Sequence, residues 1–340
     1  MQAAVVGAGN FGTAIANIVA SNGVHVHLWI RDEAQLADIL VHGENRRYLP
    51  GHPLVEGIAP TSDLSRALGT ADVVFVTVPS ASFRQVSAEL DGRVQPGTFV
   101  ISATKGIEAG FRLMSQILEE MLPEARIGVI SGPNLAEEMA DGRYTGTVVA
   151  SKHEELRTTA QRILTSPTFR VYSNDDVYGV ELGGALKNIY AIVCGMATAL
   201  NVGQNALAML VTRSLAEMGR FAVSMGANPF TFLGLAGVGD LFATCTSPLS
   251  RNFQLGVKLA RGTPLDDAMD ELGKLAEGVN TVRVVHAKSR ELDVYMPLAD
   301  GLHRLLFDGA DLGGIISGLM NSEQRVDVEF VAPTVWSHQQ

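Results

Sequence analysis

The chain has 340 residues, enough for two domains, and a formal net charge of −10. This acidic balance argues against nucleic acid as the main partner and makes any local group of basic residues a candidate anion site. Its two cysteines, Cys194 and Cys245, imply no disulfide framework and fit a reducing compartment, so we expect a cytoplasmic protein.

Neither a targeting signal nor a metal site is expected. The N-terminus shows no basic region followed by an apolar stretch, so no signal peptide is predicted. The long weakly polar stretch at residues 189–211 is interrupted by polar residues, which favours two buried helices over a membrane span. The eight histidines are scattered and pair with no Cys or Asp/Glu cluster, so no metal is expected.

A dinucleotide-binding fingerprint opens the chain. A strand-like run at residues 3–6 precedes Gly7-Ala8-Gly9-Asn10-Phe11-Gly12, and a helix-like segment follows at 13–21. Gly7 would allow a tight turn, Gly9 a close approach to a pyrophosphate, and Gly12 the packing of helix on strand. The positive end of the helix would then face the phosphates. The alternative is a coincidental glycine-rich turn.

The second predicted strand, residues 24–30, runs into Arg31 and Asp32. An acidic residue there would hold the ribose 2′-hydroxyl of NAD, whereas an arginine would pair with the 2′-phosphate of NADP. We therefore favour NADPH over NADH, although Asp32 keeps NAD open and Arg31 could be a solvated loop residue.

Further strands are predicted at residues 72–79, 98–103, 126–130, 147–150 and 169–172, with a helix at 154–164. Ligands bind outside the carboxyl ends of such parallel strands. Lys105 follows one strand end, and Gly132 and Asn134 follow the next, so all three are candidate ligand contacts. A surface lysine is the plain alternative for Lys105.

An isolated lysine marks a predicted helix at residues 176–191, which we expect residues 173–175 to cap. Lys187 is the only charged residue between Glu181 and Arg213. Gly183 and Gly184 leave the preceding turn without bulk, so a ligand could approach there. Apolar surroundings lower the pKa of a lysine and suit it to proton transfer. Otherwise its head would reach out to water.

The second half of the chain is predicted to be mainly α-helical. Within it, Asp240 is the lone charge between Arg220 and Arg251, and Lys187 is its natural partner; it could also cap a helix starting at Leu241. Ser250-Arg251-Asn252 places three donors side by side, which suits a phosphate, although a surface turn would also explain it.

Together these motifs resemble the bacterial type of NAD(P)-dependent glycerol-3-phosphate dehydrogenase. Its matching features run through most of the chain, from about residue 3 to about residue 310. They are Gly-Ala-Gly-Asn-Phe-Gly-Thr-Ala at 7–14, Asn-Arg-Arg-Tyr-Leu-Pro at 45–50, Thr-Lys-Gly-Ile-Glu at 104–108, Ser-Gly-Pro-Asn-Leu-Ala-Glu-Glu at 131–138, Gly-Val-Glu-Leu-Gly-Gly-Ala-Leu-Lys-Asn at 179–188, Gly-Leu-Ala-Gly-Val-Gly-Asp-Leu at 234–241, Ser-Arg-Asn at 250–252 and Ala-Glu-Gly at 276–278. Departures are mild: Asn134 stands where serine or threonine is common, and Phe11 where tryptophan or tyrosine is common.

The resemblance implies interconversion of sn-glycerol 3-phosphate and dihydroxyacetone phosphate by hydride transfer with NAD(P)H, supplying the backbone of phospholipids. It implies Lys187 as proton donor and acceptor, which we expect Asp240 to orient, and a homodimer. The fold expected is α/β: a Rossmann-like, mostly parallel sheet domain at 1–174, a mainly α-helical substrate domain at 175–325 and a tail at 326–340.

The resemblance also assigns binding residues. Those expected at the substrate are Lys105, Gly132, Asn134, Lys187, Asn188, Asp240, Thr244, Ser250, Arg251 and Asn252. Besides Gly7, Gly9 and Gly12, those expected at the cofactor are Asn10, Phe11, Arg31, Lys105, Ala136, Arg251, Leu275 and Glu277.

Two other functions stay open at the level of sequence. One is a different dehydrogenase with the same two-domain plan, acting on another small hydroxy acid or alcohol. The other is a non-catalytic nucleotide-binding protein, against which the isolated Lys187 and Asp240 count, because a sensor needs no desolvated proton donor.

Overall fold

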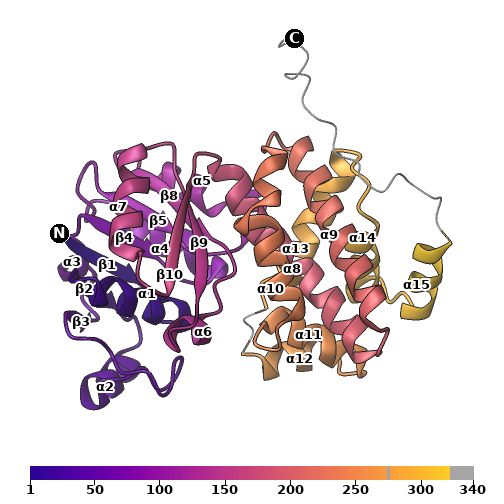
Figure 1. Cartoon of the computed structure of the whole chain (residues 1–340), viewed down its shortest axis with the longest axis horizontal. Coiled ribbons are helices and arrows are strands. Elements are labelled where there is room, and N and C mark those ends of the chain that lie inside the picture. Colours follow the sequence, from indigo (N-terminus) through magenta and orange to yellow (C-terminus); the bar gives the residue numbers. More distant parts are fainter. Residues whose placement is uncertain (274–275, 322–340) are drawn as a thin grey trace, which may run out of the picture.

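The structure is a computed structural model that describes residues 1–273 and 276–321. Leu275 and the predicted tail at 326–340 lie outside this range. Figure 1 shows a sheet flanked by helices from the first half of the chain, beside a bundle of helices from the second half.

The first half forms an eight-stranded sheet of order β10-β9-β8-β5-β4-β1-β2-β3. Neighbouring strands are parallel except for β8 and β9, which are antiparallel, so the predicted mostly parallel sheet is confirmed. Only β3 was not predicted, because it is short, contains Pro60 and lies at the sheet edge, where a missing N–H is tolerated. The strands are β1 Gln2–Val6, β2 His25–Trp29, β3 Ile58–Thr61, β4 Val73–Val76, β5 Phe99–Ser102, β8 Arg126–Ser131, β9 Thr145–Ala150 and β10 Phe169–Asn174.

Side chains alternate between two hydrophobic cores, one on each face of the sheet. Ala3 and Val5 of β1 belong to one core, and Ala4 and Val6 belong to the other. Helices α1 Asn10–Ser21 and α7 Glu154–Leu164 pack on the first face, and α4 Ser80–Leu90 and α5 Met114–Met121 on the second. The remaining elements of this half are α2 Glu33–His42, α3 Leu64–Leu68, α6 Ala136–Ala140 and the hairpin β6 Ile107–Glu108 with β7 Arg112–Leu113.

After β10, every regular element of the described residues is helical, as predicted. The central element is α8 Val177–Ala199, most of which is buried in a third core. Around it lie α9 Gln204–Ser224, the 3₁₀-helix η1 Pro229–Leu233, the π-helix η2 Leu235–Gly239, α10 Asp240–Thr246, α11 Arg251–Ala260, α12 Leu265–Glu271, α13 Gly278–Glu291, α14 Pro297–Phe307 and α15 Leu312–Met320.

Two local predictions are wrong. The cap of α8 is Asp176, whose carboxylate accepts a hydrogen bond from the Gly179 N–H, rather than residues 173–175. The second of the two helices expected to be buried, α9, is buried only on one face of its second half, because its first turns form part of the molecular surface.

Helix α8 is long and apolar enough to cross a membrane by length and composition, but 83% of its most apolar window is buried inside the protein. Its apolar surface is therefore used for packing, as in the core helix of a globular protein.

Candidate functional site

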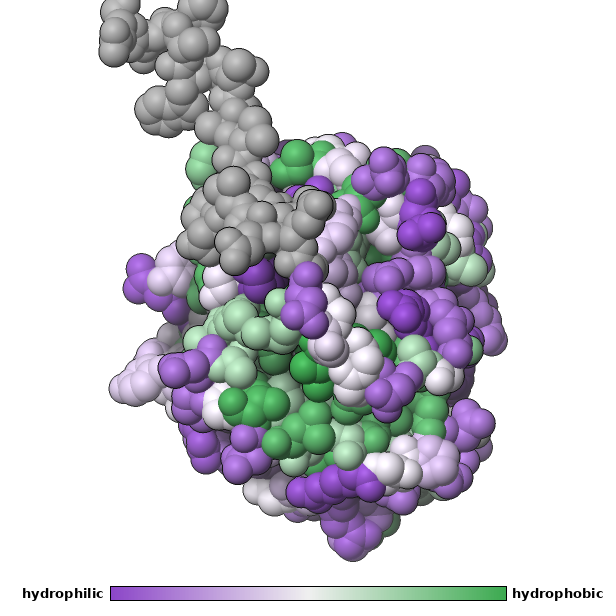
Figure 2. Space-filling model, turned by 90° about the vertical axis from the view of Figure 1, so that its right-hand side faces the viewer, coloured by the Kyte–Doolittle hydropathy of each residue, from purple (hydrophilic) through white to green (hydrophobic). Residues whose placement is uncertain are grey.

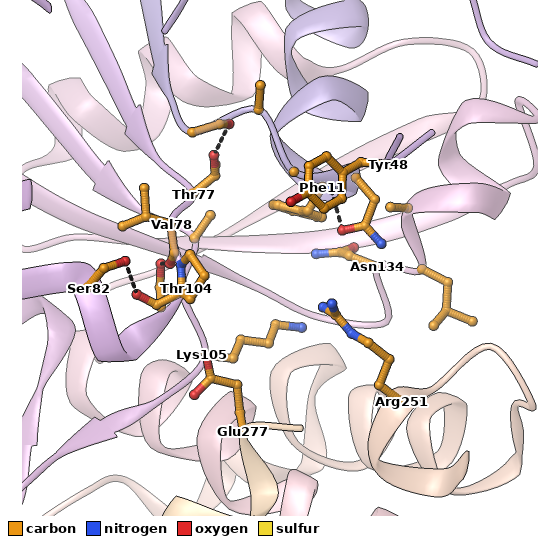
Figure 3. A pocket seen from close by; sticks show the side chains of 18 of the residues that line it. Phe11, Tyr48, Thr77, Val78, Ser82, Thr104, Lys105, Asn134, Arg251 and Glu277 are labelled. Atoms are coloured by element: carbon orange, nitrogen blue, oxygen red, sulfur yellow. Dashed lines mark hydrogen bonds between the residues drawn. The ribbon is translucent and has the colours of Figure 1, made fainter. Parts of the chain in front are cut away.

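A cleft of about 510 Å³ is lined by residues from both halves of the chain. The sheet half contributes loops that follow strand ends, and the helical half contributes α8, α10 and the start of α11. Figure 3 shows Lys105 and Arg251 extending into this space below Asn134 and Phe11. The cleft thus lies at the sheet edge where ligands bind in parallel α/β folds.

The glycine fingerprint forms one end of the cleft. Gly7 has φ +113°, which an L-residue rarely adopts, and a Cβ on Gly12 would collide with the Gly7 carbonyl. Gly9 has open space where a side chain would lie, and as the N-cap of α1 it receives no side-chain cap. This geometry fits a pyrophosphate at the start of α1.

Buried amides hold the fingerprint loop in place. Asn45 Nδ2 donates to the Ala8 carbonyl at 3.0 Å and to Thr13 Oγ1 at 2.8 Å. Gln35 Nε2 also donates to the Ala8 carbonyl, at 2.8 Å. Asn45 belongs to one of the matched motifs, but its supporting role could not be predicted because its partners lie in other segments.

Asp32 is already engaged at the end of β2. Its carboxylate caps α2 by accepting from the N–H groups of Ala34 and Gln35, and it accepts from Arg47 at 2.8 Å. The Gln35 N–H and the Arg47 guanidinium are the main causes of a lowered pKa for this exposed carboxyl. Arg31 and Arg47 both line the cleft.

Two buried residues, Lys187 and Asp240, form one network with the half-buried Lys105 at the bottom of the cleft. Lys187 Nζ donates to Asp240 Oδ1 and, at 2.6 Å, to Thr244 Oγ1, while Lys105 Nζ donates to Asp240 Oδ2 at 2.7 Å and to the Gly132 carbonyl at 2.9 Å. The predicted pairing of Lys187 with Asp240 is confirmed. Neither lysine is the solvated surface side chain of the alternative reading.

The helix-cap reading of Asp240 is wrong. Gly239 is the N-cap of α10, and Asp240 is the first residue of the helix, with its side chain 1% exposed and turned toward the two lysines. An acidic side chain in the first turn is still favoured by the helix dipole.

The glycines before Lys187 serve packing, not ligand approach as we expected. A Cβ on Gly183 would meet the Ala236 carbonyl oxygen at 2.6 Å, and one on Gly184 would meet Ser131 and the stem of Lys105. The bare turn therefore lets Lys105 lie against α8 and reach the same carboxylate as Lys187.

Burial lowers the pKa of Lys187 to about 7, and the positive charge of Lys105 acts in the same direction. The Asp240 carboxylate opposes this shift. A lysine with a pKa near 7 can both donate and accept a proton at neutral pH.

Ser250, Arg251 and Asn252 stand at the start of α11 and line the cleft. Ser250 Oγ caps the helix by accepting from the Phe253 N–H at 3.3 Å, and Asn252 Oδ1 accepts from the Gly278 N–H at 2.9 Å. Ser250 and Asn252 are buried, so a plain surface turn is wrong for them. Arg251 reaches into the cleft, where partial burial lowers its pKa.

Asn134 has a buried acceptor oxygen without a hydrogen-bond partner among the described residues. Its Nδ2 donates to Thr147 Oγ1 at 2.8 Å, but its Oδ1 is buried without a hydrogen-bond partner, on the wall of the cleft. A buried acceptor of this kind is satisfied by a donor on a ligand. Gly132, with φ +141°, holds its carbonyl toward Lys105 instead of lining the cleft.

The remaining predicted residues line the cleft as well. They are Asn10, Phe11, Ala136, Asn188, Thr244 and Glu277. Leu275 lies outside the described residues, so its predicted contact stays a prediction.

Sequence reasoning missed the loop after β4. Thr77, Val78 and Pro79 line the cleft, and the Ser80 N–H donates to Glu277 at 3.1 Å, with a second contact between their side chains. The loop thereby joins the two halves of the chain. A loop that follows a predicted strand is a candidate ligand site. This loop was missed because the strand was predicted to extend to residue 79, whereas it ends at Val76.

Among the residues that the structure describes, no group of three or more His, Cys, Asp or Glu side chains could hold a metal ion.

The chain combines a nucleotide-binding sheet domain with a helical domain that carries a buried lysine, and the cleft is lined by both. These features define a two-domain NAD(P)-binding oxidoreductase. Family models of the N- and C-terminal domains of NAD-dependent glycerol-3-phosphate dehydrogenase match residues 2–157 and 176–317. The chain belongs to this family.

Relatives agree over nearly the whole length. The glycerol-3-phosphate dehydrogenase [NAD(P)+] of Saccharophagus degradans is 56% identical over 96% of this chain and 91% of its own. That of Ectopseudomonas mendocina is 55% identical over 96% of both chains. The crystal structure of glycerol-3-phosphate dehydrogenase from Coxiella burnetii superposes with a TM-score of 0.90 at 36% identity, covering 94% of this chain and 99% of that one.

Proposed function

We propose that this enzyme interconverts sn-glycerol 3-phosphate and dihydroxyacetone phosphate with NAD(P)H, and that Lys187 donates and accepts the proton. The observation that carries the proposal is the buried Lys187–Asp240–Lys105 network at the bottom of a cleft that also holds the fingerprint loop and Arg251.

The proton would move at Lys187 Nζ. The nicotinamide, when bound, supplies or accepts the hydride at C2 of the substrate. In reduction, the Lys187 ammonium protonates the developing C2 alkoxide; in oxidation, the neutral amine takes the proton from the C2 hydroxyl. Asp240, which accepts from Lys187 on one carboxylate oxygen and from Lys105 on the other, would orient Lys187, and Lys105 would help polarise the carbonyl.

The phosphate would bind at the start of α11. Arg251 brings a guanidinium that can contact two phosphate oxygens, and the helix start adds its partial positive charge. Binding energy gained at this phosphate would fix C2 against Lys187, although the phosphate takes no part in the chemistry.

NADPH is the proposed preferred cofactor. In an NAD-specific site a free carboxylate at the end of the second strand holds the 2′-hydroxyl. Here Asp32 is occupied by the α2 N–H groups and by Arg47, and Arg31 lies on the cleft beside it. A 2′-phosphate would therefore meet positive charge rather than a bare carboxylate.

We propose that the enzyme supplies glycerol 3-phosphate for phospholipid synthesis, in the cytoplasm and as a homodimer. Light scattering coupled to gel filtration would test the dimer by giving the mass in solution.

The test of the proposed reaction is oxidation of NADPH by the purified protein with dihydroxyacetone phosphate, repeated with NADH and with unphosphorylated dihydroxyacetone. We expect turnover that requires the phosphate and is faster with NADPH at low cofactor concentration. Turnover of a hydroxy acid but not of glycerol 3-phosphate would instead favour a different dehydrogenase. Cofactor binding without turnover on any of these substrates would favour a nucleotide-binding protein without catalysis.

A further inference from the structure

An open apolar groove of about 470 Å³ lies on the helical half, away from the catalytic cleft. It runs between α9, α14 and α15, with the end of α8 at its base. Figure 2 shows hydrophobic side chains gathered on part of this face, with hydrophilic ones around them. Several lining side chains are open to solvent: Leu200, Met209, Ile316 and Met320 are each at least 42% exposed. Apolar patches of this kind mark surfaces that bind another part of a protein.

Helix α15, which forms one wall of the groove, is apolar but largely uncovered. Helix α15 has the sequence Leu-Gly-Gly-Ile-Ile-Ser-Gly-Leu-Met, yet it contains no buried residue. Ile315 faces α14, since a Cβ on Gly301 would meet it at 2.9 Å, but Ile316 and Met320 remain exposed. A helix that is apolar on most of its sides is stable in water only when a second surface covers it.

The chain itself continues from this wall. Met320 lines the groove, and Asn321 alone separates it from residues 322–340 in the sequence. Within them, Val326-Asp327-Val328-Glu329-Phe330 alternates strictly between apolar and acidic residues. In an extended segment the apolar side chains point to one face and the acidic ones to the other. At roughly 3.3 Å per residue, the six to ten residues after Met320 reach about 20–33 Å, which is enough to return along the groove.

Charge favours the same occupant. Arg213 and Arg220 of α9 stand in the groove wall. Arg220 is oriented by its Nε donating to the Tyr295 carbonyl at 2.9 Å, and its guanidinium lies 5.6 Å from the Tyr295 ring centroid. Asp327 and Glu329 offer carboxylates that can pair with such guanidinium groups.

The one acidic side chain in the groove wall does not oppose this pairing. Glu217 is 1% exposed and accepts from the N–H groups of Leu298 and Ala299 and from the Tyr190 hydroxyl. Its carboxylate is therefore directed inward to the start of α14 rather than into the groove.

We propose that residues 326–331 bind as an extended segment along this groove of their own subunit. Val326, Val328 and Phe330 face the apolar floor, and Asp327 and Glu329 face Arg213 and Arg220. The segment then completes the core of the helical half. This role does not depend on the proposed reaction, because the groove and the cleft have no lining residue in common.

The test is a cysteine pair in the full chain. Met209→Cys is combined in turn with Val326→Cys, Val328→Cys or Phe330→Cys, and each protein is oxidised mildly and run on a non-reducing gel. The native cysteines are buried, and the single variants control for them. We expect a disulfide within one chain for at least one pair. A disulfide only between two chains would assign the groove to a second copy, and no disulfide for any pair would also overturn the proposal.

A second measurement covers the case in which cysteines disturb the fold. Phe330→Asp should lower Tm by about 4 °C or more and increase binding of the dye ANS, because it removes the apolar cover. Val335→Asp, outside the alternating segment, is the matched control and should change neither. Equal behaviour of the two variants would contradict the proposal.

Discussion

Lys105 and Lys187 donate to opposite oxygens of one buried carboxylate, that of Asp240. One negative charge thus faces two positive ones, so that the carboxylate cannot fully compensate both ammonium groups. Burial of Lys187, with the nearby positive charge of Lys105 adding to it, lowers the pKa of this lysine to about 7. The fold itself thus lowers the pKa of Lys187, the residue that we propose as the proton donor.

Lys187→Ala should lower kcat at least about 10²-fold, the usual contribution of a positioned acid–base group. Cofactor binding should persist, because the glycine loop lies at the other end of the cleft. Steady-state kinetics with dihydroxyacetone phosphate and a direct NADPH titration measure the two effects. The exposed Lys152→Ala is the control and should behave as wild type. Turnover near the wild-type value would remove Lys187 from the proton step.

The two directions of the reaction should show opposite pH dependence. Since the Lys187 pKa is about 7, ketone reduction needs the ammonium and should slow as pH rises through that value. Alcohol oxidation needs the neutral amine and should speed up over the same range. Because Asp240 raises this pKa, Asp240→Asn should move both profiles to lower pH. Profiles of kcat/KM in both directions measure this, and parallel profiles would contradict the assignment.

The pairing of Lys187 with Asp240 could be predicted from the sequence, because each residue stands alone among uncharged neighbours. Lys187 and Asp240 are the lone charges of two long uncharged stretches, and a buried charge needs an opposite one. The strand–glycine–helix order likewise specifies local geometry that the structure reproduces, down to the positive φ of Gly7.

Contacts between distant segments could not be predicted. Ser80 and Glu277 are 197 residues apart, and nothing in either local sequence points to the other. The same holds for the pairing of Arg47 with Asp32. This pairing occupies the carboxylate after β2, which the sequence alone left open for a ribose hydroxyl. For Gly183 and Gly184 the sequence correctly indicated a turn without side-chain bulk, but it could not show what fills the space beside them. The fold shows that other parts of the protein fill it.

Arg251→Ala should chiefly weaken phosphate-bearing substrates. We expect KM for dihydroxyacetone phosphate to rise by about 10-fold or more, as for loss of a charged hydrogen bond of 1.5–3 kcal/mol. Weak activity on unphosphorylated dihydroxyacetone should change little. The exposed Arg261→Ala, at the other end of α11, is the control. An equal loss on both substrates would indicate a structural arginine.

Arg31→Ala and Arg47→Ala should each weaken NADPH more than NADH. Arg47→Ala should have the further effect of improving NADH binding, because it frees the Asp32 carboxylate for a 2′-hydroxyl. KM values for both cofactors, measured side by side, give the ratio. Arg46→Ala is a matched control, since Arg46 pairs with Asp38 and does not line the cleft. Equal weakening of both cofactors would exclude a 2′-phosphate contact.

Glu217 should make the protein less stable as pH rises from about 4.5 to 7. Burial raises its pKa to about 7, so the folded protein keeps a proton that the unfolded chain releases near the ordinary glutamate pKa of 4.5. Its stabilising contribution is complete below 4.5 and is lost as pH rises through 7. Glu217→Gln stays uncharged and should therefore flatten this decline in Tm, with exposed Glu56→Gln as control.

Glu181, whose pKa burial also raises to about 7, should still contribute its part of the decline in Tm in the Glu217→Gln variant. A Tm profile unchanged by Glu217→Gln would show that this carboxyl is ionised in the folded state, held by the N–H groups at the start of α14.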